Sequence, residues 1–289
     1  MDEMIERKRT RKHGEFRAVV VLSGGQDSTT CLFWALANGV DKVYPVTFDY
    51  NQRHKREIEA AKTIVDIARM IYGRDRVQEH EVIELGPVLK GTSPLVSGEQ
   101  LEQYKDHGSL PGGLEKTFVP MRNQLFLTIA ANRAAVHECE ALITGVCEED
   151  YGGYPDCRAT FILALQHACN LGTFTGQDGA PESLAILTPL MKLTKKAAVE
   201  LALTLPGCYK ALAYSHTSYD GAYPPTGHDH ATLLRAKGFE EAGVPDPLVL
   251  RAYLENLMPL PAWVFDQGAD FVMKFCNLAD LRWPSSESL

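Results

Sequence analysis

Six consecutive residues near the start of the chain have the composition of a phosphate-binding loop: Ser23-Gly24-Gly25-Gln26-Asp27-Ser28. They lie between an apolar, β-branched run at 18–22 and a helical pattern at 28–38. Glycines let the backbone approach an anion closely, and a helix N-terminus presents N–H groups with positive partial charge. The lysine and the GKS or GKT ending of a Walker A loop are absent, and so is the GxGxxG spacing. These residues therefore predict an anion site of a different class.

Further polar segments share one property, which is that each follows an apolar run or opens a predicted helix. They are 49–54, 118–123, 145–158 and 193–195. Functional groups of a parallel sheet gather beyond the carboxyl ends of its strands. We therefore expect these segments to lie close together at one edge of a sheet.

The elements that position these segments alternate between strands and helices. Apolar runs predict strands at 18–22, 43–48, 141–145 and 184–187, and the segment 79–85 is a further strand candidate. Helical spacing predicts helices at 28–38, 57–70, 122–137, 160–171 and 194–203, and Thr194 is expected to be the N-cap of the last one. This alternation predicts right-handed βαβ units and an α/β fold, with an open parallel sheet and helices on both faces.

Composition divides the chain into three predicted parts: a flexible basic tail at 1–15, an α/β domain at 16–205 and a C-terminal appendage at 206–289. The tail either is solvated or docks on nucleic acid or an acidic partner. The appendage begins with a stretch rich in Tyr, Pro, His and Gly and is predicted to have one or two short helices near the C-terminus. Within the domain, 86–117 is rich in Gly, Ser and Pro and predicts a long surface loop.

Composition also excludes several classes of protein. With 289 residues, of which 45% are hydrophobic, the chain can bury a full core, which excludes global disorder. A net charge of −8 argues against a surface that coats nucleic acid. No apolar run approaches the ~18 residues that cross a bilayer. Seven cysteines without a CxxC spacing predict a reduced, cytoplasmic protein.

In their order along the chain, the polar segments resemble the 7-cyano-7-deazaguanine synthase family of the PP-loop ATP-pyrophosphatase superfamily. The loop at 23–28 has the superfamily pattern SGGxDS, the string GYPDCR at 153–158 is specific within that superfamily, and the match runs from about Val19 to about Pro247. The resemblance implies an adenine nucleotide α-hydrolase-like fold and an ATP-dependent carbon–nitrogen ligase of the queuosine pathway. Such an enzyme adenylates the carboxylate of 7-carboxy-7-deazaguanine and, with ammonia, forms the 7-amido and then the 7-cyano product. A homodimer is implied as well.

The resemblance also implies roles for individual residues. Asp27 would hold magnesium, while Arg122 and Lys195 would stabilise the charge that develops on the phosphates. The residues expected at the nucleotide are Ser23, Gly24, Gly25, Gln26, Asp27, Ser28, Thr29, Phe48, Gln52 and Gly145. Those expected at the deazaguanine are Tyr50, Gln52, His54, Arg122, Asn123, Asp150, Tyr154, Asp156 and Arg158. Asp156 is expected to accept hydrogen bonds from the guanine-like edge and Arg158 to pair with the substrate carboxylate.

The chain departs from the family pattern at a zinc site that the family builds from four cysteines. At those positions this sequence has Ser218, Thr226, Asp229 and Thr232. Neutral hydroxyls are poor zinc ligands, so we expect no zinc and a hydrogen-bonded loop instead. The alternative is a replacement metal site built from His216, His228, Asp229 and His230.

Two other functions stay open at the level of sequence. The first is a diverged homologue in antiphage defence or phage DNA modification, which binds or activates a deazaguanine and transfers it to a protein or nucleic acid. The second is a PP-loop tRNA thiolase, which needs a nucleophilic cysteine, for which Cys147 and Cys157 are the candidates. The missing zinc cysteines motivate the first alternative, whereas the acidic composition disfavours the second.

Overall fold

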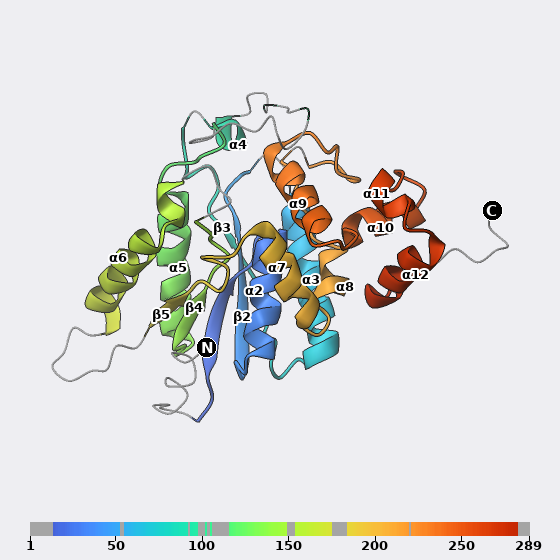
Figure 1. Cartoon of the computed structure of the whole chain (residues 1–289). Helices are drawn as coiled ribbons and strands as arrows, with labels where there is room; N and C mark the ends of the chain where they lie inside the picture. The colour runs from blue at the N-terminus through green and yellow to red at the C-terminus, as the bar shows by residue number, and fades with distance from the viewer. Residues whose placement is uncertain are drawn as a thin grey trace.

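The computed structural model describes residues 14–52, 55–91, 93–97, 102, 105, 116–148, 154–174, 184–219 and 221–282. Within this part of the chain, a sheet of five parallel strands forms the centre (Figure 1). The strands are β1 (Arg17–Val21), β2 (Lys42–Asp49), β3 (Glu81–Glu84), β4 (Ala141–Ile143) and β5 (Ala185–Leu187). Each overlaps a segment that the sequence predicts to be a strand, so the strand predictions are confirmed.

The strand order is β3-β2-β1-β4-β5. The chain moves outward from β1 through β2 to β3, then returns to the other side of β1 and adds β4 and β5. The order therefore reverses between β1 and β4, where Ala18 pairs with Ala141. In an open parallel sheet, the crevice at such a reversal is where ligands bind.

The helices that connect and cover these strands largely match the predicted ones. They are α2 (Gln26–Ala37), α3 (Arg56–Tyr72), α4 (Pro94–Ser97), α5 (Arg122–Val136), α6 (Ala159–Cys169) and α7 (Lys195–Thr204), together with short helical turns η2 (Pro155–Cys157) and η3 (Asn170–Phe174). Thr194 is the N-cap of α7, as predicted, and its hydroxyl accepts from the N–H of Ala197 at 3.2 Å. Helix α4 lies inside the predicted loop at 86–117, because a four-residue helix is too short to show a periodic pattern.

Alternate strand residues face opposite helical layers, which explains the continuous apolar runs in β1 and β4. Ala18 and Val20 belong to one core, which α2, α3 and α7 cover. Val19 and Leu142 belong to a second core on the other face, which α5 and α6 cover. Figure 1 shows the two helical layers on either side of the sheet. The predicted α/β class, with helices on both faces of a parallel sheet, is confirmed.

Beyond residue 206, the described part of the chain has five helices: α8 (Cys208–Leu212), α9 (His230–Glu241), α10 (Pro247–Leu254), α11 (Ala262–Phe265) and α12 (Ala269–Leu278). The prediction of one or two short helices is therefore wrong. Helix α9 shows the reason, since its buried residues include His230, Thr232 and Arg235. A helix that buries polar side chains lacks the apolar stripe by which an amphipathic helix is predicted.

The C-terminal helices share a core with the α/β part. Tyr209 of α8 and Phe239 of α9 belong to the same apolar cluster as Phe33 of α2 and Val199 of α7. Figure 1 shows α7, α8 and α9 on the side of the sheet where α2 and α3 lie. The predicted boundary between 205 and 206 stays a prediction. Most of the predicted basic tail, residues 1–13, lies outside the described residues.

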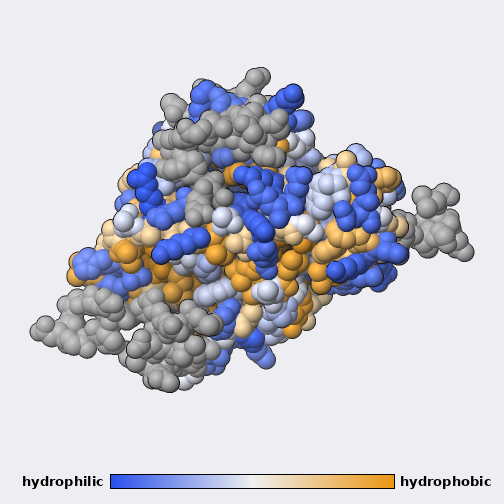
Figure 2. All heavy atoms as spheres, viewed as in Figure 1, coloured by the Kyte–Doolittle hydropathy of each residue, from blue (hydrophilic) through white to orange (hydrophobic). Residues whose placement is uncertain are grey.

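Among the described residues, no helix is both long enough and apolar enough to cross a membrane. On the face shown in Figure 2, hydrophobic residues gather in a middle band and hydrophilic residues lie above and below it. The large apolar side chains that are exposed include Met70 of α3, Leu163 of α6 and Phe265 of α11. Because these three come from separate elements, they are ordinary exposed apolar residues.

Candidate active site

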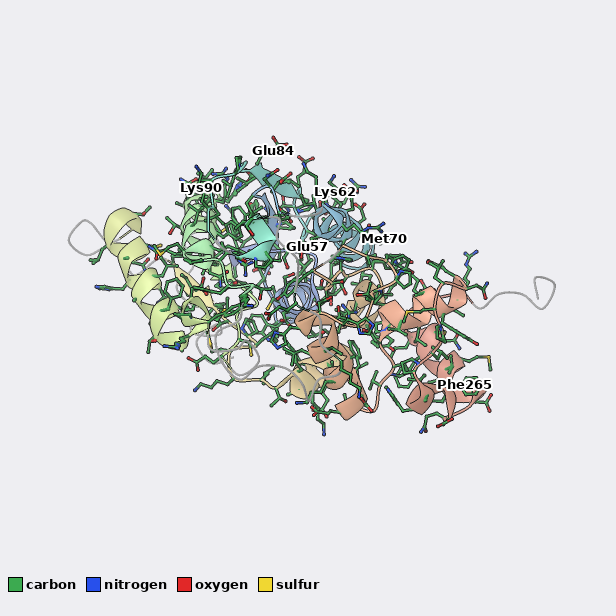
Figure 3. The ribbon with its side chains drawn as sticks, turned by 90° about the horizontal axis from the view of Figure 1, so that it is seen from above. Glu57, Lys62, Met70, Glu84, Lys90 and Phe265 are labelled. Carbon is green, nitrogen blue, oxygen red and sulfur yellow. The ribbon has the colours of Figure 1, made fainter. Side chains whose placement is uncertain are left out.

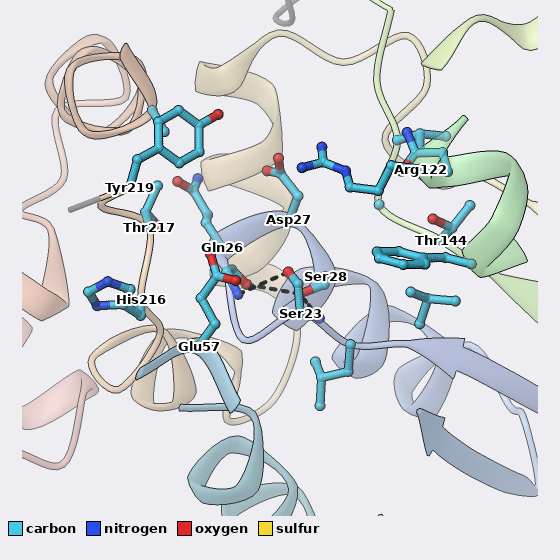
Figure 4. Close-up of a pocket in the computed structure, with 18 of the residues that line it drawn as sticks. Ser23, Gln26, Asp27, Ser28, Glu57, Arg122, Thr144, His216, Thr217 and Tyr219 are labelled. Carbon is cyan, nitrogen blue, oxygen red and sulfur yellow. Dashed lines mark hydrogen bonds between the residues drawn. The ribbon is translucent and has the colours of Figure 1, made fainter. Parts of the chain in front are cut away.

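A cavity opens beyond the carboxyl ends of β1 and β4, where the strand order reverses. Its wall comes from the loop 23–28, the end of β2, the first turns of α3, α5 and α7, the segment 216–219 and helix α9. Figure 4 shows side chains from the loop, α3, α5 and the segment 216–219 around one space. The expectation that the polar segments meet at one edge of the sheet is confirmed for these elements.

Hydroxyl groups hold the loop in shape. Ser28 Oγ accepts from the N–H of Ser23 at 3.1 Å and lies 3.0 Å from Ser23 Oγ. The same Oγ donates to the carbonyl of Gly25 at 3.2 Å, and Thr29 Oγ1 donates to that carbonyl at 2.7 Å. Residues 25–28 line the cavity. Because a helix provides no internal acceptor for the N–H groups of its first turn, this end of α2 is suited to an anion.

Two glycines let neighbouring elements close on the loop. Gly24 has φ +86°, and a Cβ there would lie 2.2 Å from the carbonyl oxygen of Glu57. A Cβ at Gly145, just after β4, would lie 3.0 Å from the carbonyl carbon of Asp27. A side chain at either position would therefore push α3 away from the loop or β4 away from α2.

Lys195 reaches the loop from the N-terminus of α7. Its Nζ lies 2.8 Å from Oδ2 of Asp27, and the two side chains are 9% and 13% exposed. Helix α9 packs tightly against this lysine, since a Cβ at Gly238 would lie 2.7 Å from the Cβ of Lys195. The position of the Lys195 ammonium thus depends on a helix that the sequence assigned to the appendage.

Arg122 supplies a second cation from the first turn of α5. The preceding residue, Met121, has φ 65° and turns the chain into the helix. Desolvation lowers the pKa of Arg122, but Tyr50, Tyr219 and Asp156 outweigh that effect and hold the pKa above its ordinary value. Arg122 therefore stays charged although it is largely enclosed, and Figure 4 shows its guanidinium directed into the cavity.

Glu57 lines the cavity from the first turn of α3, although the sequence analysis does not single it out. Burial raises the pKa of its carboxyl to about 7, against the opposing effect of Arg122. Its place in the sequence, three residues after the polar segment 49–54, is the signal that points to it. Thr217, Tyr219 and Arg235 also line the cavity without having been predicted, because their part of the chain was interpreted only through the zinc site.

Aromatic rings form another part of the wall. Phe48 and Phe126 stack with ring centroids 4.4 Å apart, and Tyr50 packs against Phe126 at 5.1 Å. The hydroxyl of Tyr154 lies 2.6 Å from Thr117 Oγ1. Flat ring surfaces of this kind are suited to a planar heterocycle.

Asp156 and Arg158 are not among the residues that line the cavity. Burial raises the pKa of Asp156, whose Oδ2 accepts from the backbone N–H of Asn123 at 3.3 Å. Asn123 itself lines the cavity, and its side-chain amide donates to the carbonyl of Asp156 at 3.3 Å. Arg158 is exposed at the N-cap of α6. Asp156 thus supports a wall residue, and the recognition of a base by these two residues stays a prediction.

The cavity wall contains most of the residues predicted for the nucleotide and the deazaguanine: Ser23, Gly25, Gln26, Asp27, Ser28, Phe48, Tyr50, Gln52, Arg122, Asn123, Gly145, Tyr154 and Lys195. Gly24 and Thr29 are outside the wall but shape the loop. His54 and Asp150 lie outside the described residues. The roles of all these residues stay predictions.

The donors of the cavity fit a polyphosphate. Gln26 is 5% exposed, and its Nε2 has no hydrogen-bond partner among the described residues. A buried donor without an acceptor is costly, and a phosphate oxygen in the cavity would satisfy it. Together with Lys195 and Arg122, this donor makes the residues present suited to ATP. Asp27 has the carboxylate that Mg²⁺ prefers, so it is suited to a nucleotide-bound magnesium.

The cysteines near the cavity are not activated. Cys157 lines the wall, and burial raises the pKa of its thiol to about 12. Cys147 is buried and donates its S–H to the carbonyl of Leu193 at 3.3 Å. A thiol that stays protonated is a poor nucleophile, so neither geometry nor electrostatics favours the sulfur-transferring alternative.

Three of the four positions expected to replace zinc cysteines come together around one carboxylate. Ser218 Oγ and Thr232 Oγ1 donate to Oδ2 of Asp229 at 2.9 and 2.8 Å, and the N–H of Thr232 donates to Oδ1 at 3.0 Å. We call these three residues the Asp229 cluster. Thr226 and His228 are exposed. Within the described residues, no three His, Cys, Asp or Glu side chains are grouped so that they could hold a metal. The absence of zinc stays a prediction.

A protein-family model described as "Queuosine biosynthesis protein QueC" matches residues 17–243. The chain belongs to the QueC family. The resemblance seen in the sequence is thereby confirmed, and the range matched by the QueC model contains the loop 23–28, Arg122, Lys195 and Gly238. Helices α10 to α12 lie beyond that range.

Curated members of the family are similar to this chain over nearly their whole length. A 7-cyano-7-deazaguanine synthase of Gloeobacter violaceus is 47% identical over 234 residues, which are 80% of this chain and 95% of that protein. One of Chromobacterium violaceum is 46% identical over 240 residues, 83% of this chain and 95% of that protein. Among solved structures, a 4-thiouridine synthetase–RNA complex with bound ATP covers 92% of this chain and 52% of its own, at 16% identity and a TM-score of 0.42.

Proposed function

We propose that this protein is a 7-cyano-7-deazaguanine synthase, a cytoplasmic ATP-dependent ligase that converts 7-carboxy-7-deazaguanine into the 7-cyano compound. The observation that carries the proposal is the cavity in which the loop 23–28, Arg122 and Lys195 meet in a chain of the QueC family. The names of the relatives from Gloeobacter violaceus and Chromobacterium violaceum support the choice of substrate.

In this proposal the first activation makes a poor electrophile reactive. The substrate carboxylate attacks the α-phosphorus of ATP, which forms an acyl-adenylate and releases pyrophosphate. Ammonia then displaces AMP to give the amide and loses one proton. A second ATP activates the amide oxygen in the same way, with a second release of pyrophosphate, and loss of AMP and of both N–H protons of the amide leaves the nitrile.

The residues of the cavity have distinct tasks in these steps. The loop 23–28 binds the phosphate chain through backbone N–H groups, as anion-binding helix N-termini do. Lys195 and Arg122 stabilise the negative charge on the phosphates during each attack. Magnesium, held by Asp27, neutralises part of the same charge when it is bound.

The deazaguanine occupies the aromatic part of the cavity. Its ring system packs near Tyr50 and Phe126, while Asn123, supported by Asp156, presents hydrogen-bonding groups. The carboxylate of the substrate is then directed toward the nucleotide, with Arg158 as its proposed partner. A homodimer stays part of the proposal, on the basis of the family resemblance alone.

The experiment is to incubate the protein with ATP, magnesium, ammonium and 7-carboxy-7-deazaguanine and to follow all products by mass spectrometry. We expect the amide and then the nitrile, with AMP and pyrophosphate as the nucleotide products. Asp27→Asn is expected to abolish magnesium-dependent turnover, whereas Asp66→Asn, an exposed carboxylate on α3, serves as the matched control.

Two outcomes would contradict the proposal. ADP and phosphate as the only nucleotide products would reject cleavage between the α and β phosphates. A deazaguanine attached to protein or nucleic acid, without free nitrile, would instead favour the defence or DNA-modification alternative, for which we find no supporting observation among the named relatives.

A further inference from the structure

Glu57 is a carboxyl group at the phosphate-binding loop that the proposed mechanism does not use. Its backbone oxygen lies against Gly24, so the first turn of α3 is held directly on the loop. Figure 4 shows its side chain among those that line the cavity, on the side of the loop where Gln26 is drawn. Seen from above in Figure 3, Glu57 lies near the centre of the molecule, whereas Glu84 and Phe265 lie at the periphery. Glu57 is half-buried and lines the cavity.

Charged and titratable groups from several elements line the same cavity as Glu57. They are Asp27 from α2, Tyr50 after β2, Arg122 from α5, Lys195 from α7, His216 and Tyr219 from the segment 216–219, and His230 and Arg235 from α9. Burial raises the pKa of Glu57 to about 7, and Arg122 opposes this effect without cancelling it. The Lys195 ammonium is engaged by Asp27 at 2.8 Å. Glu57 is therefore poised between its acid and its carboxylate form near neutral pH.

Gln26 provides an independent sign that a ligand with acceptor oxygens belongs here. The side chain is 95% buried, it lines the same cavity, and its Nε2 has no partner among the described residues. Figure 4 shows Gln26 and Glu57 on the same side of the loop. An acceptor that satisfies Gln26 thus comes close to the carboxyl of Glu57.

A phosphate chain next to Glu57 brings several negative charges toward a half-buried carboxyl on the wall of the cavity. Like charge in a site of low polarity disfavours the carboxylate form strongly, whereas the acid form offers an O–H donor to a phosphate oxygen. Protonation removes the repulsion and adds a hydrogen bond in one event.

We propose that Glu57, in its acid form, donates a hydrogen bond to a phosphate oxygen of the bound nucleotide, so that nucleotide binding takes up one proton that pyrophosphate release returns. The inference rests on the proposed function, because it assigns ATP to the cavity. It makes Glu57 a ligand-contacting residue and couples occupancy of the site to protonation. No bond other than O–H is made or broken, and the proton comes from the solvent.

The test is calorimetric titration of the full chain with ATP and magnesium, without ammonium or the deazaguanine acid, in buffers of different ionisation enthalpy. The dependence of the heat on buffer gives the number of protons taken up per nucleotide. At pH 8 a carboxyl with a pKa of about 7 is roughly one-tenth protonated before binding, so we expect uptake of close to one proton. At pH 6, where the carboxyl is already protonated, the uptake is expected to fall well below half of that number.

Glu57→Gln keeps a hydrogen-bond donor but cannot titrate. This variant is expected to bind ATP within a few-fold of the wild-type affinity and to lose the proton uptake at pH 8. Glu59→Gln, an exposed carboxylate in the same first turn of α3, is the matched control and is expected to keep the uptake. If the Glu57→Gln variant does not fold, the proton uptake of the wild-type chain at pH 8 is compared with its uptake at pH 6, and this comparison alone tests the inference.

Each other result overturns the inference in a recognisable way. Uptake that persists in Glu57→Gln but is lost in His216→Gln assigns the proton to the histidine. ATP binding without uptake, combined with weaker magnesium dependence in Glu57→Gln, makes Glu57 a metal ligand in its carboxylate form. Failure of the wild-type chain to bind ATP overturns the proposed function itself, which keeps the two failures distinct.

Discussion

The ammonium of Lys195 lies 2.8 Å from Oδ2 of Asp27, although the two residues are 168 positions apart in the chain. Both side chains are nearly enclosed, at 9% and 13% exposure. The pair joins α7 to the N-terminus of α2 across the cavity. The cation proposed for the phosphates and the carboxylate proposed for magnesium thus neutralise each other in the structure.

The first prediction concerns the stability of this pair. Lys195→Met leaves the carboxylate of Asp27 enclosed without its cation and is expected to lower the free energy of unfolding by about 3 kcal/mol. Urea denaturation of Lys195→Met, Asp27→Asn and the double variant measures the coupling. The double variant is expected to be more stable than the sum of the single effects predicts. Strictly additive losses would show that the two side chains do not stabilise each other.

The second prediction concerns Gly238, whose place on α9 lets that helix approach Lys195. A Cβ there would lie 2.7 Å from the Cβ and 3.1 Å from the backbone carbonyl carbon of Lys195. Gly238→Ala is expected to cost about 1–3 kcal/mol of stability by overpacking and to lower turnover by displacing the ammonium. Thermal unfolding and steady-state kinetics provide the two measurements.

Ala236→Ser changes an exposed position of the same helix and serves as the control for Gly238→Ala. We expect it to alter stability by less than about 0.5 kcal/mol. If Gly238→Ala left both stability and turnover at wild-type values, α9 would not position Lys195.

The third prediction concerns the Asp229 cluster. Asp229→Ala removes the N-cap of α9 and two hydroxyl partners at once, so we expect a loss of about 3 kcal/mol in the free energy of unfolding. Thr226→Ala, at the exposed fourth position of the expected zinc site, is the matched control and is expected to change stability by less than about 0.5 kcal/mol.

Removal of metal ions tests whether the segment around the Asp229 cluster depends on zinc for its stability. If hydrogen bonds to Asp229 hold the segment between α8 and α9, a chelator leaves Tm unchanged when magnesium is absent from both samples. Elemental analysis that finds one zinc per chain, together with a lower Tm after chelation, would refute the prediction and direct attention to His216, His228 and His230.

The fourth prediction concerns the reactivity of Cys157. Because burial raises the pKa of its thiol to about 12, only about one molecule in ten thousand carries the thiolate at pH 8. We expect iodoacetamide to label Cys157 much more slowly than the half-buried Cys169, as measured by peptide mapping of the folded protein. Preferential labelling of Cys157 at pH 8 would contradict the assigned pKa and revive the sulfur-transferring alternative.

The sequence alone determines the features that depend on neighbours a few residues away. Local residue patterns predict the five strands, and the glycines and hydroxyls of 23–28 predict an anion-binding turn, because both signals come from adjacent residues. Thr194 is identified as an N-cap for the same reason, since the cap accepts from an N–H only three residues further along. The polar segments taken in order, with GYPDCR as the most specific string, indicate the family that the QueC model confirms.

Only the tertiary structure decides which side chains that are distant in sequence come into contact and how far they are buried from solvent. The pairing of Asp27 with Lys195, the approach of Gly238 to that lysine and the gathering of Ser218 and Thr232 around Asp229 all depend on packing between separate elements. The number of C-terminal helices was underestimated because α9 buries polar residues, which leave no apolar stripe to detect. Glu57 is an ordinary glutamate in sequence, and only its enclosure against the loop shifts its protonation toward neutral pH, since the cost of charge depends on the surroundings that the fold creates.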